Sequence, residues 1–292
     1  MSHIHTFTLL NKVIDDTFDV DLLHEYTLSI LVSSGTFQFC VVHTAKNRCV
    51  MLEHYEYPHQ NNVVSLLAVL KEIYDYNSYL NAGFWRCIKL NIKNLKFSLV
   101  PNALFAESYA KDILSVNCTL AETEALYYYK HSGNDTINVF ATEQAIVEWF
   151  KKMYANKLVD VVHHTSSMME GVLQYPLENQ AKSVFVNVED GIATIAVRDH
   201  NNLIFINNFK FVTANDLLYY TLFVYDGLDL NIDSIPLILM GNIQKNSDFY
   251  QRLYKYIRHI YFSQRPNGLK FGYKFDEIGE HHYFGLYNTI LC

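Results

Sequence analysis

Two stretches of the chain share one pattern of apolar runs and polar turns. In residues 183–211, three runs (SVFVNVE, IATIAV and LIFINNFKF) are separated by a turn with Gly191 and by the polar turn DHNN. Residues 28–55 repeat this order, with Gly35 in the first turn and AKNR as the second. Alternation, β-branched residues and turn residues at these spacings predict three antiparallel strands in each stretch. Aligning Gly35 with Gly191 brings all three strands into register without a gap, which indicates an internal duplication.

A helix and a further apolar run follow each set of three strands. After the first set, apolar residues at i, i+3, i+4 and i+7 over 63–74 predict a helix, and residues 95–100 (LKFSLV) predict a buried strand. After the second set, Thr213 and Asp216 resemble a capping box, and residues 234–240 (SIPLILM) predict the matching strand. A strand reached through a helix should lie parallel to its predecessor. The sequence therefore predicts an α/β fold with mixed sheets, in which each half reads β-β-β-α-β followed by further α and β elements.

The best linker lies near residue 178, where Pro176 precedes the polar run ENQ. We therefore expect a first domain over 1–178 and a second over 179–292. The first is longer mainly through residues 115–142, an expected insertion with hairpin strands at 125–131 and 136–142 around the turn SGND. Residues 264–292 give no clear pattern, and a final strand over 284–291 is the only element predicted there.

Composition narrows the class of protein. Half of the 292 residues are hydrophobic, 18% are charged, and the formal net charge is -7. Because no Lys/Arg cluster is present, we expect no nucleic-acid partner. We also expect no membrane span, since no apolar run approaches the roughly 18 residues that one needs. The five cysteines form no C-x-x-C pair and the N-terminus lacks signal-peptide features, so we expect a reduced, cytoplasmic protein.

Two copies of β-β-β-α-β-α-β with glycine in the first turn of each resemble the actin-like ATPase fold, which is related to the ribonuclease H-like fold. This superfamily includes actin, sugar kinases and the actin-like heat-shock chaperones. The resemblance implies that nucleotide would lie between the domains, with an Asp-x-Gly phosphate turn from each. Glycines let backbone N–H groups approach phosphate oxygens, and the aspartates hold Mg²⁺ or orient water.

The first phosphate turn implied by this resemblance is Ser33-Ser34-Gly35-Thr36. Gly35 and Thr36 match the pattern, whereas Ser33 replaces the aspartate. The loss removes the principal metal anchor, since Mg²⁺ is usually held by one or two carboxylates plus phosphates. Residues 28–34 contain no carboxylate at all, so two-metal nuclease chemistry of the ribonuclease H type is disfavoured.

The second phosphate turn implied by the resemblance runs from Glu189 to Thr194. Glu189 replaces aspartate and is the one candidate catalytic residue, while Gly191 and Thr194 match the pattern. The adenosine turn keeps a single glycine, Gly241, of the usual pair. This degenerate pattern is similar to an uncharacterised family, domain of unknown function 3822, found mainly in Bacteroidetes, whose membership implies the fold and no established activity. The glycines can equally serve tight turns alone.

Histidine pairs are the other candidate chemistry. His163-His164 and His281-His282 are adjacent pairs, and neighbours on a strand point to opposite faces, so we expect no metal site. The 22 tyrosines either fill the core or supply a partner surface, for which the 115–142 insertion is the best place.

Three functions remain open. The first is an actin-like protein without catalysis or cofactor that binds a protein partner as a scaffold. The second is an ATPase or kinase-like phosphotransferase that binds ATP and Mg²⁺ through Glu189 and the degenerate turns. The third is small-molecule binding between the domains, since such clefts are common ligand sites. The sequence leaves the partner, the biological process and the oligomeric state open.

Overall fold

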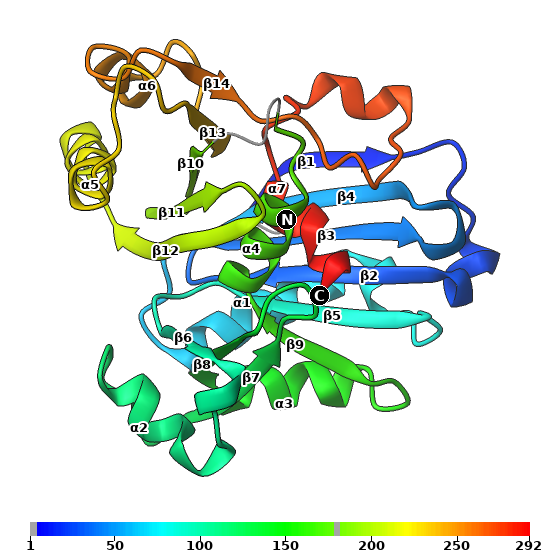
Figure 1. The fold of residues 1–292 in the computed structure, drawn as a ribbon. Coiled ribbons are helices and arrows are strands. Elements are labelled where there is room, and N and C mark those ends of the chain that lie inside the picture. Colours follow the sequence, from blue (N-terminus) through cyan, green and yellow to red (C-terminus); the bar gives the residue numbers. More distant parts are fainter. Residues whose placement is uncertain (1–4, 178–181) are drawn as a thin grey trace.

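The computed structural model describes residues 5–177 and 182–292, which form three β-sheets joined by helices (Figure 1). The expected domain boundary at residue 178 lies outside the described residues. The first sheet has six strands in the order β1-β4-β3-β2-β5-β9. In chain order these are β1 (Thr8–Ile14), β2 (Tyr26–Val32), β3 (Thr36–His43), β4 (Arg48–Glu56), β5 (Cys87–Ile92) and β9 (Val159–His163).

The second sheet repeats the central part of the first. Its order is β12-β11-β10-β13-β14, and its strands are β10 (Ser183–Glu189), β11 (Ile192–Asp199), β12 (Asn202–Lys210), β13 (Leu237–Gly241) and β14 (Ile260–Phe262). β10 pairs antiparallel with β11 and parallel with β13, just as β2 pairs with β3 and β5. The predicted duplication and mixed sheets are therefore confirmed.

In each of the first two sheets, one helix connects the three antiparallel strands to the parallel strand that follows, and the two helices are equivalent. α1 (Val63–Tyr76) starts at Asn62, whose side chain accepts a hydrogen bond from the backbone N–H of Ser65 at 2.9 Å. α5 (Ala214–Gly227) starts with the predicted capping box of Thr213 and Asp216. Such caps satisfy backbone N–H groups that have no partner within the helix.

A third sheet holds the extra residues of the first half. Its order is β6-β8-β7, with β6 (Phe97–Pro101), β7 (Glu124–Lys130) and β8 (Thr136–Glu143), and α2 (Ala110–Ser115) packs against it. This sheet corrects one prediction, because the strand expected at 95–100 is β6, which pairs antiparallel with β8. The strand parallel to β2 is instead β5, whose polar Asn91 is buried and bonds to Ser167 and Thr289.

Two helices cross between the first two sheets, near the centre of Figure 1. α4 (His164–Gln174) connects β9 to the second half, and α7 (Phe284–Asn288) packs on it. The strand predicted over 284–291 is wrong, since α7 and a 3-10 turn (Thr289–Leu291) occupy this stretch. The close approach depends on Gly171, where a Cβ would lie 2.3 Å from Asn288 Nδ2.

The remaining helices, α3 (Gln144–Met153) and α6 (Asp248–Leu253), belong to the first and second halves respectively. Each half has its own apolar core: one spans β2–β5 with α1 and α3, the other β10–β13 with α5 and α6. Within residues 5–177 and 182–292, none of the helices has the length and apolar character that a membrane crossing requires.

Candidate functional site

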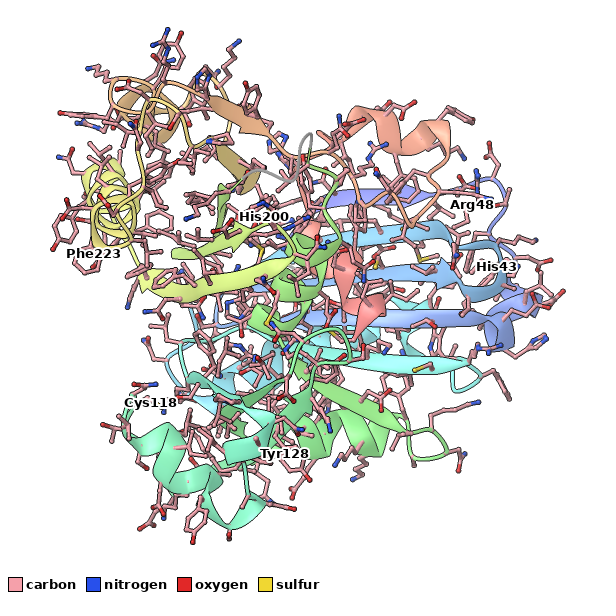
Figure 2. All side chains as sticks on the ribbon, in the orientation of Figure 1. His43, Arg48, Cys118, Tyr128, His200 and Phe223 are labelled. Carbon is pink, nitrogen blue, oxygen red and sulfur yellow. The ribbon has the colours of Figure 1, made fainter. Side chains whose placement is uncertain are left out.

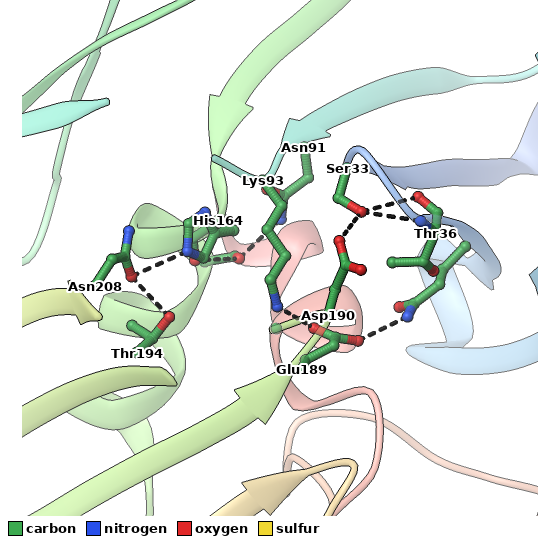
Figure 3. A network of polar contacts seen from close by, with 12 residues as sticks. Ser33, Thr36, Asn91, Lys93, His164, Glu189, Asp190, Thr194 and Asn208 are labelled. Atoms are coloured by element: carbon green, nitrogen blue, oxygen red, sulfur yellow. Dashed lines mark hydrogen bonds and ion pairs between the residues drawn. The ribbon is translucent and has the colours of Figure 1, made fainter. Parts of the chain in front are cut away.

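The two glycine turns meet where the two sheets face each other (Figure 3). The hydroxyl of Ser33, which follows β2, donates a hydrogen bond to the carboxylate of Asp190, which follows β10. Ser33 Oγ also accepts hydrogen bonds from the backbone N–H groups of Gly35 and Thr36, at 3.2 and 3.0 Å. The first turn is thus organised around one serine oxygen that also contacts the second turn.

Glycine is required in these turns for two different reasons. Asp190 and Gly191 have φ angles of +52° and +69°, so the second turn is a two-residue hairpin with both residues in the left-handed region. Gly35 does not have a positive φ. A Cβ on Gly35 would lie 2.6 Å from Asp190 Oδ1 and 3.0 Å from the His59 ring, so its role is to allow the turns to approach.

Glu189, the candidate catalytic residue, is engaged by two side chains of the first domain. Lys93 Nζ lies 2.7 Å from Glu189 Oε2, and Gln38 Nε2 donates to Glu189 Oε1 at 2.7 Å. Burial raises the pKa of Glu189, but the charge and hydrogen bond of Lys93 and the bond from Gln38 outweigh it, so the net pKa is lowered. Glu189 is therefore an ionised partner of Lys93 at neutral pH.

Asp190 has the opposite shift. Burial raises its pKa, and the bond from Ser33 and the charges of Lys93 and His59 only partly offset that effect. Two adjacent carboxyl groups thus have pKa values displaced in opposite directions. Such a pair is typical of functional sites, although buried ion-pair networks produce it as well.

Lys93 was missed by the sequence reasoning. It is the first residue after β5, its backbone N–H donates to Val32 O at 2.8 Å, and its side chain has 0% exposure. The sequence does contain one signal for this residue, a lysine directly after an apolar run. The carboxyl ends of parallel strands converge on the cleft of an α/β fold, so a lysine at such an end is expected to lie in the cleft. Because residues 95–100 were predicted to be the parallel strand, Lys93 was not recognised as the residue at its end.

A cleft of about 760 Å³ lies on one side of the contact between Ser33 and Asp190. It is lined by both turns, including Gly191, and by residues that precede α1, α3 and α5. On the other side is a smaller cavity of about 100 Å³, lined by Thr36, Glu189 and Gly241. Asp190 lines both spaces.

Two histidines line the smaller cavity. Burial lowers the pKa of His54 and of His282 to about 4, so both are neutral at pH 7. Thr36 Oγ1 is buried there without a hydrogen-bond partner among the described residues. The cavity thus combines three carboxyl groups, of Glu56, Glu189 and Asp190, with neutral donors and acceptors.

Gly241 and Thr194 lie apart from the turns. Gly241 has φ +82°, its N–H donates to His281 O at 2.8 Å, and a Cβ there would lie 2.4 Å from Val188 O. Thr194 is fully buried on β11 and donates to Asn208 Oδ1 at 2.8 Å. The structure thus gathers Ser33, Gly35 and Gly191 at the contact and places Thr36 and Gly241 in the lining of the smaller cavity. Thr194 lies in a separate network with Asn208 (Figure 3).

Both carboxylates at the contact are already engaged by the protein, Glu189 by Lys93 and Gln38 and Asp190 by Ser33. Within the part of the chain that the structure describes, no group of three or more His, Cys, Asp or Glu side chains is arranged to hold a metal ion. The arrangement can hold the two halves of the chain together, and it leaves the larger cleft accessible to a ligand.

Duplicated mixed sheets, two crossing helices and facing glycine turns define the actin-like ATPase fold. The family model of DUF3822, a protein of unknown function, matches residues 15–260, and the chain belongs to this family. The predicted fold and family are therefore confirmed. No curated protein matches the chain.

Solved structures agree with this fold. A Bacteroides thetaiotaomicron protein with actin-like ATPase fold and unknown function has a TM-score of 0.79 at 18% identity, covering 94% of this chain and 99% of its own. A chain of the PilM–PilN type IV pilus biogenesis complex has a TM-score of 0.55 at 11% identity, covering 91% and 98%. The ethanolamine utilization protein EutJ of Carboxydothermus hydrogenoformans has a TM-score of 0.53 at 6% identity, covering 96% and 92%. At these identities the likeness concerns the fold alone.

Proposed function

We propose that this protein is a nucleotide-independent member of the actin-like superfamily that works as a scaffold by binding a protein partner. The observation that carries the proposal is the bond between Lys93 and Glu189, supported by that between Ser33 and Asp190. In this proposal, these bonds take the place of the phosphate and Mg²⁺ contacts that the resemblance implies for the two turns. A buried lysine and a carboxylate that neutralise each other leave no uncompensated charge for an ion to satisfy.

The fold comparison supports a partner-binding role, because one similar chain was solved as part of the PilM–PilN complex. The third sheet offers a surface for such a partner. Exposed apolar side chains project from this sheet and the segments around α2: Leu104, Tyr109, Val116 and Tyr128. Exposed aromatic residues supply contact area at low entropic cost, and family-specific insertions are frequent sites of function.

Nucleotide independence is tested by titration calorimetry and thermal shift with Mg-ATP and Mg-ADP. We expect no saturable heat at millimolar nucleotide and no change in melting temperature. Glu189→Ala is the matched control, because it removes the one candidate metal carboxylate. Micromolar binding that disappears in Glu189→Ala would reject the proposal and establish the ATP-dependent alternative.

Partner binding is tested by placing the photo-crosslinker p-benzoylphenylalanine at Tyr128 or at Phe223 in the source bacterium. Tyr128 is 48% exposed on the third sheet, and Phe223 is 55% exposed on α5 (Figure 2). We expect a defined adduct from position 128 and none from position 223, which controls for nonspecific capture by an exposed ring. Adducts at both positions, or at neither, would contradict a partner surface on the third sheet.

A second candidate function is ligand binding in the larger cleft, with ATP as the ligand that the fold suggests. The favouring observation is the cleft volume of about 760 Å³, which lies within the ~300–1,000 Å³ range of small-molecule sites. The calorimetry above separates this function from the first.

A further inference from the structure

A third space lies away from the cleft and from the smaller cavity, and the two crossing helices form part of its wall. Its volume is about 360 Å³, and it is formed by the turn after β3, the C-terminal end of α4, the 266–269 loop and the end of the chain. None of its lining residues lines the interdomain cleft. It is therefore a separate space, and its size falls in the ~300–1,000 Å³ range of small-molecule sites.

The lining of this cavity is uncharged. Among the described residues that form it, none is Asp, Glu, Lys, Arg or His. Three aromatic side chains contribute, from Tyr175, Phe284 and Tyr287, together with four side-chain amides. Aromatic walls with a few amide groups suit a ring that carries hydrogen-bonding groups, whereas an ion would lose its hydration without gaining a counter-charge.

The carbonyl groups at the C-terminal end of α4, which lies at this cavity, already accept hydrogen bonds from an arginine. Arg198 Nη1 donates to Val172 O at 2.8 Å and to Tyr175 O at 2.6 Å, and Arg198 does not line the cavity. A helix C-terminus otherwise favours a cation. Since the arginine supplies that charge from outside, the cavity has no remaining preference for a charged ligand.

One buried polar group of the lining has no partner. The Tyr287 side chain is 1% exposed, and its hydroxyl has no hydrogen-bond partner among the described residues. Burial raises the pKa of Tyr287 well above its usual range, so the group is a neutral hydroxyl. The hydroxyl is covered by protein atoms, so Tyr287 contributes its ring to the wall, and the hydrogen-bonding groups open to a ligand are the side-chain amides.

The shape of the cavity is maintained by the contact between the crossing helices. A Cβ on Gly171 would lie 2.7 Å from the Phe284 ring and 2.3 Å from the Asn288 amide, and Asn288 Nδ2 donates to Phe284 O at 2.9 Å. These contacts fix two walls before any ligand arrives. Preformed walls reduce the ordering cost of binding.

We propose that this cavity is a binding site for an uncharged ring compound, whose ring lies against Tyr175 and Phe284 and whose polar groups bond to side-chain amides of the lining, such as Gln174. The site is independent of the nucleotide cleft and of the proposed partner surface.

The test uses three neutral probes and their charged counterparts: indole with indole-3-acetate, adenosine with AMP, and glucose with glucose 6-phosphate. Saturation-transfer NMR and thermal shift are measured on the full chain at up to millimolar probe. We expect at least one neutral probe to bind at least tenfold more tightly than its charged counterpart. No binding by any neutral probe, or equal binding by the charged counterpart, would overturn the proposal.

Variants assign the binding to this cavity. Ile290→Trp fills the space from a half-buried lining position and should abolish binding, with Leu269→Trp as a second filling variant should the first fail to fold. Gln174→Leu should weaken binding two- to tenfold, the loss expected for one hydrogen bond. Leu95→Trp, in the interdomain cleft, is the control and should have no effect. Binding that survives the filling variants, or that Leu95→Trp abolishes, would reject the site.

Discussion

The turns after β2 and after β10 are equivalent by register, but they contribute differently to the contact between the domains. The first supplies a serine hydroxyl and a glycine without a positive φ, whereas the second supplies two carboxylates and a left-handed Asp-Gly pair. The same asymmetry occurs after the parallel strands. Lys93 and Asn242 both donate their backbone N–H to the neighbouring strand, at Val32 O and Val188 O. Duplication thus preserved the backbone, while the side chains diverged into complementary halves of one contact.

The largest effect should come from removing the lysine of this contact. Lys93→Met leaves Glu189 buried without a counter-charge, and we expect a loss of about 3 kcal/mol in the free energy of unfolding. The measurement is urea unfolding followed by fluorescence. The double variant Lys93→Met/Glu189→Gln should recover at least half of the loss, because it removes the unpaired charge. Equal stability of the single and double variants would contradict the importance of the pair.

Alanine substitutions at Gly35 and Gly191 should distinguish a glycine that is needed for lack of space from one that is needed for its backbone conformation. We expect Gly35→Ala to cost roughly 2 kcal/mol through its clash with Asp190 and His59, and Gly191→Ala about 1 kcal/mol through its positive φ. Unfolding is compared in the wild type and in the Asp190→Ala background. Asp190→Ala should reduce the cost of Gly35→Ala and leave that of Gly191→Ala unchanged. A Gly35 cost that is insensitive to residue 190 would show that its turn needs glycine for another reason.

The third residues of β3 and β11 also differ in the contacts that they make. Gln38 aligns with Thr194, yet Gln38 reaches Glu189 in the other domain whereas Thr194 bonds to Asn208 in its own. Thr194→Val should therefore cost about 1 kcal/mol, the worth of one buried hydrogen bond, without affecting the cleft. NMR titration of Glu189 should give the same lowered pKa in this variant and a higher one in Gln38→Ala. A changed Glu189 pKa in Thr194→Val would connect the two networks.

The smallest effect concerns the two adjacent carboxyl groups and pH. The raised pKa of Asp190 means that the folded state binds its proton more tightly than the unfolded state, so the charged form destabilises the fold at pH 7. Asp190→Asn keeps an acceptor for Ser33 and should stabilise by roughly 1 kcal/mol or less at pH 7, a gain that fades as pH falls through the raised pKa.

Glu189 should show the opposite sign. Because its pKa is lowered from the usual value of 4.5, ionised Glu189 stabilises the folded state at pH values above 4.5. This stability is lost as the pH falls through the lowered pKa. Glu189→Gln should therefore destabilise at pH 7, with the difference shrinking at low pH. Unfolding curves between pH 3 and pH 8 compare the two variants, and effects of the same sign would refute the assignment.

Much of the fold was predictable because the strands that repeat are regular. Alternation and the turn residues around Gly35 and Gly191 predicted both antiparallel sets and their common register, which the structure confirms. The parallel strand of the first half was not found, since β5 carries Lys89 and Asn91, and the side-chain NH₂ group of the buried Asn91 donates to Ser167 and Thr289. Partners so distant in sequence leave no local pattern.

The sequence predicted that the two glycine turns would lie close together, but it did not predict which side chains would bond to each other there. The glycine alignment brought the turns to one position, but nothing local indicated that Glu189 would bond to Lys93 or that Ser33 would bond to Asp190. The helix over 284–288 was missed for a related reason, because its conformation depends on packing against Gly171 rather than on its own sequence.

The ion pair of Lys93 and Glu189 also constrains how the family can change. Either residue alone would be a buried, uncompensated charge, so substitution of one creates pressure to substitute the other. Related sequences should therefore keep both or lose both. A lineage that has lost both charges would have to hold its two glycine turns together through neutral contacts alone.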